Sequence, residues 1–216
     1  MDPEFWYRAW QEEGSRTSFH RKDVHPYLRK HAGSELLQGK RIFVPLCGKT
    51  LDLIWFRAHA SHVTGVELVE KAVLQFFSEQ NLTPTRISSQ SYEAERLTIL
   101  NRDIFDLLPE EVGPIDLVYD RAALIAFPLE MRLRYVRQID KLTPIGAKIL
   151  LITLEYAPPS PGPPFSITPE EVEDYYGNGY DIVHIERQEV PNHRMSSKFG
   201  LHFLKEHAFL LTKVYV

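Results

Sequence analysis

The chain has 216 residues, of which 25 are basic and 29 acidic, for a formal net charge of −4. Hydrophobic residues make up 44% of it and aromatic residues 12%, which is typical of a folded globular protein and not of a disordered one. The single cysteine, Cys47, excludes an intrachain disulfide and any Cys-x-x-Cys zinc or redox motif.

Charge and hydropathy also bear on partners and location. The mildly acidic charge, without a basic run, argues against nucleic acid, and no apolar run approaches the ~20 residues that span a bilayer. The N-terminal segment lacks the basic and apolar regions of a signal peptide. We therefore expect one cytoplasmic domain over residues 1–216, acting without a membrane or nucleic-acid partner.

The first half of the chain alternates between β-like and helical segments. Residues 1–40 form an aromatic, histidine-containing extension. The run at 41–46 predicts a strand, and 50–60 predicts a helix with apolar residues at helical spacing. A second strand is expected at 62–68, followed by an amphipathic helix at 70–80.

The second half continues this alternation and then changes. Further strands are expected at residues 97–100, 115–119, 147–154, 180–190 and 203–215. Helices are expected at 129–142 and 169–176. The segment 157–165 is a proline-rich extended loop, and 191–202 reads as a polar, basic loop. The last two strands, with little helix between them, predict an antiparallel hairpin at the sheet edge.

Strand–helix alternation predicts an open α/β sheet with right-handed crossovers. Ligands bind such sheets at the carboxyl ends of the strands. Glu67 ends the second strand, 19 residues after Gly48, where a carboxylate can accept hydrogen bonds from ribose hydroxyls. A solvated charge at a strand end is the structural alternative.

The loop after the first strand, PLCGK at 45–49, has one glycine where the dinucleotide fingerprint has three. It is therefore a poor pyrophosphate cradle, although it can lie against a nucleoside without phosphates. A Walker loop needs a glycine where Phe43 stands, so a nucleoside triphosphate is not expected. We expect Cys47 to be a buried small residue and not a nucleophile.

Other candidate residues follow later strands or precede the first one. Arg121 offers a forked cation for a carboxylate, or an ion pair with Asp120 or Asp116. The histidines match neither HExxH nor the Cys/His zinc spacings, and we expect no metal. The aromatic side chains of the extension either pack on the core or cover a site and exclude water. They include Phe5, Trp6, Trp10 and Phe19.

Several motifs, in order along nearly the whole chain, resemble the thiopurine S-methyltransferase family, and its compact bacterial members in particular. They are Phe5-Trp6, Trp10-Gln11, Phe19-His20, VPLCGKTLDLIWF (44–56), GVELVEKAV with QFF (65–77), YDRAALIAF (119–127), LLITLEY (150–156), GPPFSI (162–167) and EHAFLLTK (206–213). The PLCGK and GPPF segments are the most specific, because the usual first loop of methyltransferases is rich in glycine.

The resemblance implies a Rossmann-like class I methyltransferase that depends on S-adenosylmethionine (SAM) and releases S-adenosylhomocysteine (SAH). Its sheet would be seven-stranded and mostly parallel, with a C-terminal antiparallel hairpin. Residues 1–40 would be an N-terminal helical extension that acts as a lid, and residues 41–216 the core. SAM is a nucleoside without phosphates, which accounts for the unusual first loop.

The resemblance also implies roles for individual residues. Glu67 would hold the ribose, Arg121 the methionine carboxylate, and Trp10 would cover the ligand. The remaining family contacts correspond to Leu46 on SAM, Asp103 and Ile104 at the adenine, Phe19 stacked on the thiopurine ring, and Arg194 near the substrate.

The implied reaction is an in-line displacement in which the substrate sulfur attacks the SAM methyl group. Arg121 or Arg194 would stabilise the thiolate, so no strong general base is required. Selenite, tellurite, halide or sulfide acceptors on the same fold are the alternative. The chain lacks the glycine fingerprint of a nicotinamide-dependent reductase. A non-catalytic binding module would not need the SAM contacts. We expect a monomer that acts on a small thiol or metalloid.

Overall fold

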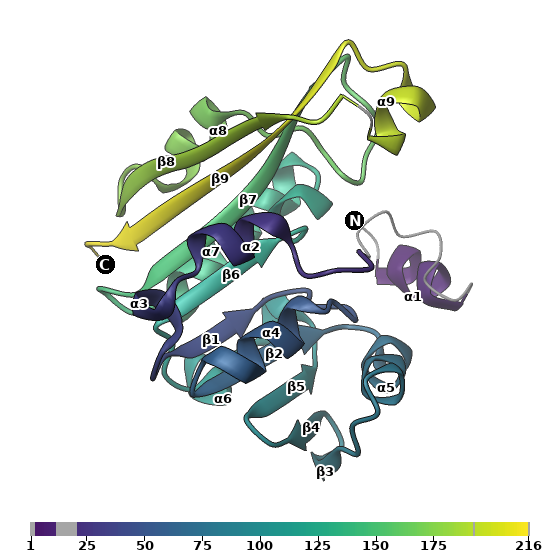
Figure 1. Cartoon of the computed structure of the whole chain (residues 1–216), viewed down its shortest axis with the longest axis vertical. Helices are drawn as coiled ribbons and strands as arrows, with labels where there is room; N and C mark the ends of the chain where they lie inside the picture. The colour runs from purple at the N-terminus through teal and green to yellow at the C-terminus, as the bar shows by residue number, and fades with distance from the viewer. Residues whose placement is uncertain (1–2, 12–20, 192, 216) are drawn as a thin grey trace. The chain divides into compact units, whose positions relative to one another are not determined.

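The structure, a computed structural model, describes residues 3–11, 21–191 and 193–215 (Figure 1). The chain forms two compact units, residues 1–118 and 119–216, and each is taken by itself below. The single domain expected from the sequence stays a prediction.

The first unit is an α/β layer built around parallel strands. In chain order it contains α1 (Pro3–Gln11), α2 (Pro26–His31), α3 (Ser34–Leu37), β1 (Arg41–Val44), α4 (Asp52–His59), β2 (His62–Glu67), α5 (Glu70–Glu79), β3 (Thr85–Ser88), β4 (Ser91–Ala94), β5 (Leu97–Asn101), the 3₁₀ helix η1 (Ile104–Asp106) and α6 (Pro109–Val112). β2 lies between β1 and β5 and is parallel to both (Figure 1). β6 (Leu117–Arg121) crosses the unit boundary, and its first residues pair with β1 in parallel.

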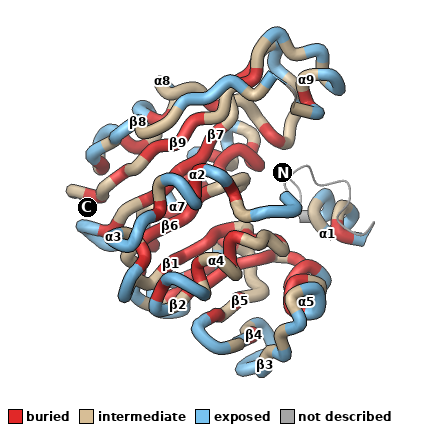
Figure 2. The backbone as a smooth tube through the Cα atoms, viewed as in Figure 1, coloured by how far each residue is buried: buried red, intermediate tan, exposed pale blue. Residues whose placement is uncertain are grey.

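Burial of β1 and β2 forms the core of this unit. Both strands are buried over most of their length (Figure 2), as expected of parallel strands with covered faces. α5 turns Ala72, Val73, Phe76 and Phe77 inward, which is the face that the helical spacing predicts. α4 and α5 begin and end within two residues of the predicted helices.

The β3–β4 hairpin was not expected from the sequence. All four residues of β3 are exposed, so no alternation of apolar and polar residues marks it as a strand. β4 pairs antiparallel with β5 and attaches the hairpin to the sheet. With it, the described residues form nine strands where seven were expected, while the predicted α/β class with a mixed sheet is confirmed.

The segment 21–40, which precedes β1, is held against α4 by hydrogen bonds. The His25 amide donates to Asp52 Oδ1 at 2.8 Å, and His25 Nδ1 accepts from the Tyr27 amide at 3.2 Å. His25 and Asp52 are both fully buried. Pro26 at the first helical position suits the start of α2. These bonds fix residues 25–31 beside the N-terminus of α4.

The second unit packs helices on a sheet of long antiparallel strands. It contains the 3₁₀ helix η2 (Leu124–Ala126), α7 (Leu129–Leu142), β7 (Lys148–Ala157), α8 (Pro169–Tyr176), β8 (Tyr180–Glu189), α9 (Arg194–Phe199) and β9 (Phe203–Lys213). β9 lies between β7 and β8, so the predicted C-terminal antiparallel hairpin is confirmed (Figure 1). α7 and α8 cover the predicted residues, and a Thr168–Glu171 capping box starts α8.

The stretch 191–202, predicted as a polar loop, instead contains a helix, α9. His193 Nδ1 accepts from the Met195 amide at 3.3 Å and caps its first turn. Met195 is buried in a cluster with Tyr156 and Leu204. One apolar anchor and one cap therefore order a segment whose other residues are mostly polar.

Candidate functional site

Three strand ends meet at one edge of the first unit. β1, β2 and β5 run in parallel, with Val44 opposite Gly65 and Glu67 opposite Asn101. Parallel strands bring their carboxyl ends to the same edge, where ligands bind in open α/β sheets. The loop at 45–51 therefore lies beside Glu67 and the residues that follow β5.

Glu67 is held by the backbone of two loops. Its Oε2 accepts from the Gly48 amide at 2.9 Å, and its Oε1 accepts from the Val69 amide at 2.8 Å. The residue is only 7% exposed. Burial raises the pKa of Glu67 to about 7, against the opposing effect of the hydrogen bonds from the backbone. The carboxylate thus links the loop after β1 to the loop after β2.

The loop after β1 has an unusual backbone. Leu46 adopts a φ of 47° and Gly48 a φ of 51°, in the left-handed region that a leucine rarely occupies. The Cys47 amide donates to Val66 O at 2.9 Å, which anchors the loop on β2. Leu46 stays partly exposed at the strand ends. Strain of this kind gathers at functional sites, where the surroundings hold it in place.

Cys47 has the environment of an inert thiol. It is buried, and its Sγ would lie 2.8 Å from a Cβ placed on Gly65. Burial, followed by the charge of Glu67, raises the pKa of the thiol well above its ordinary value. A protonated, buried thiol is a poor nucleophile. The glycine on β2 makes room for the cysteine in the loop.

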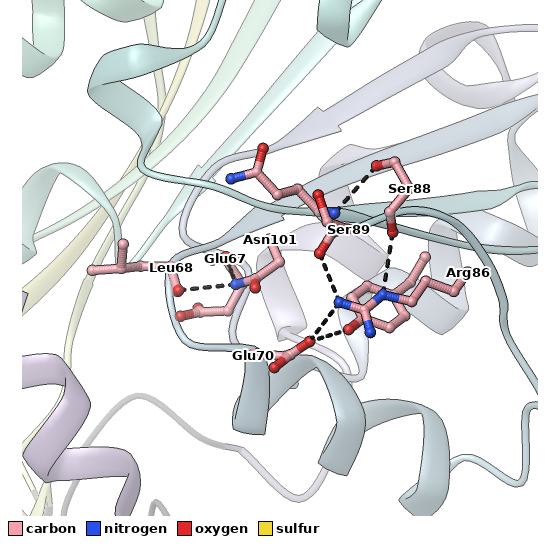
Figure 3. A network of polar contacts seen from close by, with 9 residues as sticks. Glu67, Leu68, Glu70, Arg86, Ser88, Ser89 and Asn101 are labelled. Carbon is pink, nitrogen blue, oxygen red and sulfur yellow. Dashed lines mark hydrogen bonds and ion pairs between the residues drawn. The ribbon is translucent and has the colours of Figure 1, made fainter.

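Asn101, at the end of β5, fixes the backbone that carries Glu67 (Figure 3). Its Nδ2 donates to Glu67 O at 3.0 Å and to Leu68 O at 2.9 Å. The Arg102 amide also donates to Glu67 O, at 3.1 Å. Sequence reasoning missed Asn101, because a polar residue after a strand does not reveal which carbonyls its amide reaches.

A second network ties the start of α5 to the β3–β4 hairpin (Figure 3). The Arg86 guanidinium contacts Glu70 Oε1 at 3.3 Å and donates to Ser89 O at 2.9 Å. The same guanidinium lies over the Tyr92 ring, and the Tyr92 hydroxyl donates to Glu70. Since α5 begins three residues after Glu67, the hairpin supports the short loop that follows Glu67.

Trp10 brings the N-terminal helix to the same loop. It is 3% exposed and packs against Val69 and Ala72 of the loop and helix that follow Glu67. Lys71 Nζ donates to Gln11 O at 3.1 Å, at the carboxyl end of α1. Val69 therefore contacts Trp10 through its side chain and Glu67 through its amide.

The adenine-side candidates follow β5 directly. Asp103 Oδ1 accepts from the Phe105 amide at 3.0 Å and caps η1, and Ile104 is buried at 5% exposure. The first unit thus gathers Trp10, Leu46, Glu67 and the Asp103-Ile104 pair around one set of strand ends. Phe19, the predicted substrate contact, lies outside the described residues.

In the second unit, Asp120 and Arg121 end β6. Asp120 is fully buried; its Oδ1 accepts from the Leu124 amide at 3.1 Å and its Oδ2 from the Tyr135 hydroxyl at 2.7 Å. Burial raises the pKa of Asp120 to about 6. Arg121 is partly exposed beside it. The structure therefore gives Asp120 a supporting role toward η2 and α7.

The GPPF segment is folded tightly onto the second unit. The Phe165 amide donates to Ile125 O at 2.7 Å, and the Tyr156 hydroxyl donates to Pro164 O at 2.6 Å. Gly162 has a φ of 62°, and a Cβ there would lie 2.6 Å from the Phe165 ring. Only glycine fits this turn. Arg194, the other predicted substrate contact, is exposed at the first turn of α9.

Two further properties hold for residues 3–11, 21–191 and 193–215. No group of three or more His, Cys, Asp or Glu side chains in them is arranged to hold a metal ion. None of their helices is both long enough and apolar enough to cross a membrane. The predicted contacts divide between the units, with Arg121 and Arg194 in the second and the other described ones in the first.

Comparison with known proteins gives consistent matches. The family model for thiopurine S-methyltransferase matches residues 1–214. A thiopurine S-methyltransferase from Shewanella amazonensis is 40% identical over 220 residues, covering 99% of this chain and 100% of that protein. One from Pseudomonas aeruginosa strain UCBPP-PA14 is 40% identical over 221 residues, with the same coverage.

Among solved structures, a Burkholderia thailandensis 1,6-didemethyltoxoflavin-N1-methyltransferase with bound S-adenosylhomocysteine matches with a TM-score of 0.61. The alignment covers 98% of this chain and 87% of that one at 16% identity, and at that identity it bears on the fold alone. The full-length matches to the curated relatives and to the family model together show that this chain belongs to the thiopurine S-methyltransferase family.

Proposed function

We propose that this chain transfers a methyl group from SAM to the sulfur of an aromatic or heterocyclic thiol such as a thiopurine. The observation that carries the proposal is the Glu67 carboxylate, buried at the carboxyl end of β2 and held by amides of two loops. A carboxylate at this point of a Rossmann-like sheet binds ribose hydroxyls. The single glycine of the loop at 45–49 suits a nucleoside that carries no phosphates.

Further residues of the two units are assigned to the remaining contacts of a nucleoside site. Leu46 offers an apolar surface on the loop after β1, and Trp10 covers the loop after β2. Asp103 and Ile104, which follow β5, are assigned to the adenine. Arg121, at the end of β6, is assigned to the methionine carboxylate, because its guanidinium can donate two parallel hydrogen bonds.

When bound, SAM supplies a methyl group on a positively charged sulfur, which is already an activated leaving group. The protein therefore has to align the acceptor sulfur with the methyl carbon and exclude water. We assign Phe19 to stacking on the acceptor ring, and Arg121 or Arg194 to electrostatic stabilisation of the thiolate. The acceptor sulfur bonds to the methyl carbon as the donor sulfur–carbon bond breaks, and the thiol proton passes to solvent.

Calorimetric titration with SAH tests the cofactor assignment. Glu67→Gln removes the charge that the ribose hydroxyls would face, and we expect it to weaken SAH binding by roughly tenfold to a hundredfold, the value of one or two charge-assisted hydrogen bonds. Glu95→Gln is the matched control, since Glu95 is an exposed partner of Arg57. Equal SAH affinity in Glu67→Gln and wild-type protein would overturn the assignment.

A second assay tests the acceptor. SAH formation is followed with a thiopurine, an aromatic thiol, selenite, tellurite, iodide and sulfide at matched SAM concentration. We expect the highest kcat/KM with the aromatic thiols. If an inorganic acceptor is faster by tenfold or more while SAH still binds, the acceptor class is wrong and the cofactor site stands.

A further inference from the structure

Three titratable side chains meet on neighbouring strands of the second unit. They are Glu155 on β7, His184 on β8 and His207 on β9, the middle strand of the three (Figure 1). His207 is fully buried, whereas His184 is exposed. The group therefore reaches from the interior of the sheet to water.

The hydrogen bonds fix which nitrogen of each ring faces which partner. His207 Nε2 lies 2.9 Å from Glu155 Oε2, and His207 Nδ1 lies 3.1 Å from His184 Nε2. A carboxylate only accepts, so Nε2 of His207 carries its proton and Nδ1 presents a lone pair. A proton on His184 Nε2 then fills the space between the two rings.

A bulge in β8 aims His184 at this lone pair. His184 pairs with Phe209 and Glu186 with Ala208, so one extra residue, Ile185, is inserted between the two pairs. The His184 ring stacks on Phe209 with the centroids 4.3 Å apart. Bulges of this kind redirect side chains and are frequent beside functional sites.

We propose that His184 Nε2 and His207 Nδ1 form a binding site for a divalent transition-metal cation of the Cu²⁺, Ni²⁺ or Zn²⁺ class, with Glu155 as the outer carboxylate. Two nitrogens that each lie ~2.0–2.1 Å from one metal at angles of ~90–110° are themselves about 2.9–3.4 Å apart. The observed 3.1 Å falls within that range. The cation replaces the shared proton after a small rotation of the exposed His184 ring.

The Glu155–His207 bond is the feature that favours a metal over a purely structural pair. Histidines that bind metals typically donate their second ring N–H to a carboxylate, which fixes the tautomer and raises ligand basicity. The described residues hold no three-ligand group, so solvent completes the coordination. Arg187 stands opposite His207 in the strand register and works against a cation. Lys205, 3.8 Å from Glu155 Oε1, neutralises part of the carboxylate charge.

The test uses the untagged full-length protein and Cu²⁺, Ni²⁺ and Zn²⁺, each alone, in calorimetric titrations. One equivalent should bind to wild-type protein, most tightly for Cu²⁺. Glu155→Gln should weaken binding by roughly tenfold to a hundredfold, as loss of an outer carboxylate does. His184→Ala should abolish the tight equivalent, and Arg187→Ala should strengthen it. His59→Ala, which removes an exposed histidine of the first unit, should change nothing.

Cu²⁺ electron paramagnetic resonance supplies a second readout, with two coordinated nitrogens in wild-type protein and at most one in His184→Ala. Each cation should also raise the Tm of wild-type protein but not of His184→Ala. The proposal would be overturned if His184→Ala still bound the cation tightly. It would also be overturned if wild-type protein bound the cation no more tightly than His184→Ala does. Because His184 is exposed, loss of binding in a variant with unchanged Tm without metal is not a folding defect. SAH binding is measured in parallel, so the outcome is independent of the proposed function.

Discussion

Each unit has a buried carboxylate at the end of a parallel strand, but the hydrogen-bond partners of the two carboxylates differ. Glu67, the last residue of β2, accepts from the Gly48 and Val69 amides of the loops at the sheet edge. Asp120, near the end of β6, accepts from the backbone of the η2 turn, including the Leu124 amide, and also from the hydroxyl of Tyr135, a side chain of α7. Glu67 is 7% exposed to solvent, whereas Asp120 is fully buried.

On the proposed function, this difference separates the carboxylate assigned to the ligand from a structural one. Burial raises the pKa of both groups, Glu67 to about 7 and Asp120 to about 6, so the shift by itself does not distinguish them. The partners do, because amides at an open strand end can exchange with a ligand, while a hydroxyl of a buried helix cannot. Four experiments test this contrast.

The largest expected effect is on stability. Asp120→Ala leaves the Leu124 amide and the Tyr135 hydroxyl without an acceptor in the interior, which should lower the free energy of unfolding by about 4 kcal/mol. Glu67→Ala should cost under about 1 kcal/mol, because water reaches the freed amides at the sheet edge. Urea denaturation of both variants measures the two losses. Equal losses would remove the distinction.

The second prediction concerns pH. Both carboxyls hold a proton more tightly in the folded protein, so their stabilising contribution is full below the unfolded pKa and is lost as pH rises through the folded value. For Glu67 this window runs from 4.5 to about 7, and for Asp120 from 3.8 to about 6. At ~1.4 kcal/mol per pH unit, each group accounts for a loss of about 3 kcal/mol.

Glu67→Gln and Asp120→Asn should each remove their own part of this slope. Unfolding free energies at pH 4, 5.5 and 7.5, compared with wild-type protein, give the measurement. A variant whose stability changes with pH as the wild type does would show that its carboxyl does not titrate in that window.

The third prediction isolates the side-chain partner. Tyr135→Phe removes the hydroxyl that donates to Asp120 Oδ2 and should lower stability by about 1–3 kcal/mol. That hydrogen bond lowers the pKa of Asp120, so its loss should move the pH slope of Asp120 to higher pH. SAH affinity should stay within twofold of wild type, and a larger drop would give α7 a part in the cofactor site.

The smallest effect is expected at the hairpin. Arg86→Ala removes an exposed contact to Glu70 and should cost under about 1 kcal/mol in unfolding free energy. Because that contact supports the loop after β2, it should still weaken SAH binding two- to threefold. Arg96→Ala, at another exposed arginine with a long contact to Glu95, is the control and should leave SAH affinity unchanged.

Elements with a clear apolar period could be predicted from the sequence, and those stabilised by polar contacts could not. The helix predicted at 129–142 is α7, because its inward residues recur at helical spacing. The exposed β3–β4 hairpin gives no such signal, since Arg86 and Tyr92 hold it by contacts to Glu70. α9 depends on the burial of Met195, which a single apolar residue in a polar stretch does not reveal.

The candidate site divides in the same way. Glu67 could be predicted from its position alone, because the order of strands and helices already places it at the carboxyl end of a parallel strand. Asn101 was missed, because its side-chain amide donates to two carbonyls that lie more than 30 residues away along the chain. The roles given to Trp10, Arg121 and Arg194 came from resemblance, and they stay predictions.

The Cys47–Gly65 contact makes the chain its own chemical reporter. A lone, buried thiol pressed against a strand reacts with a disulfide reagent only when the loop after β1 opens, so its modification rate counts those openings. No other thiol contributes to the signal, because the chain has one cysteine. The opening frequency of this loop can therefore be timed in unlabelled, unmutated protein, with and without a nucleoside.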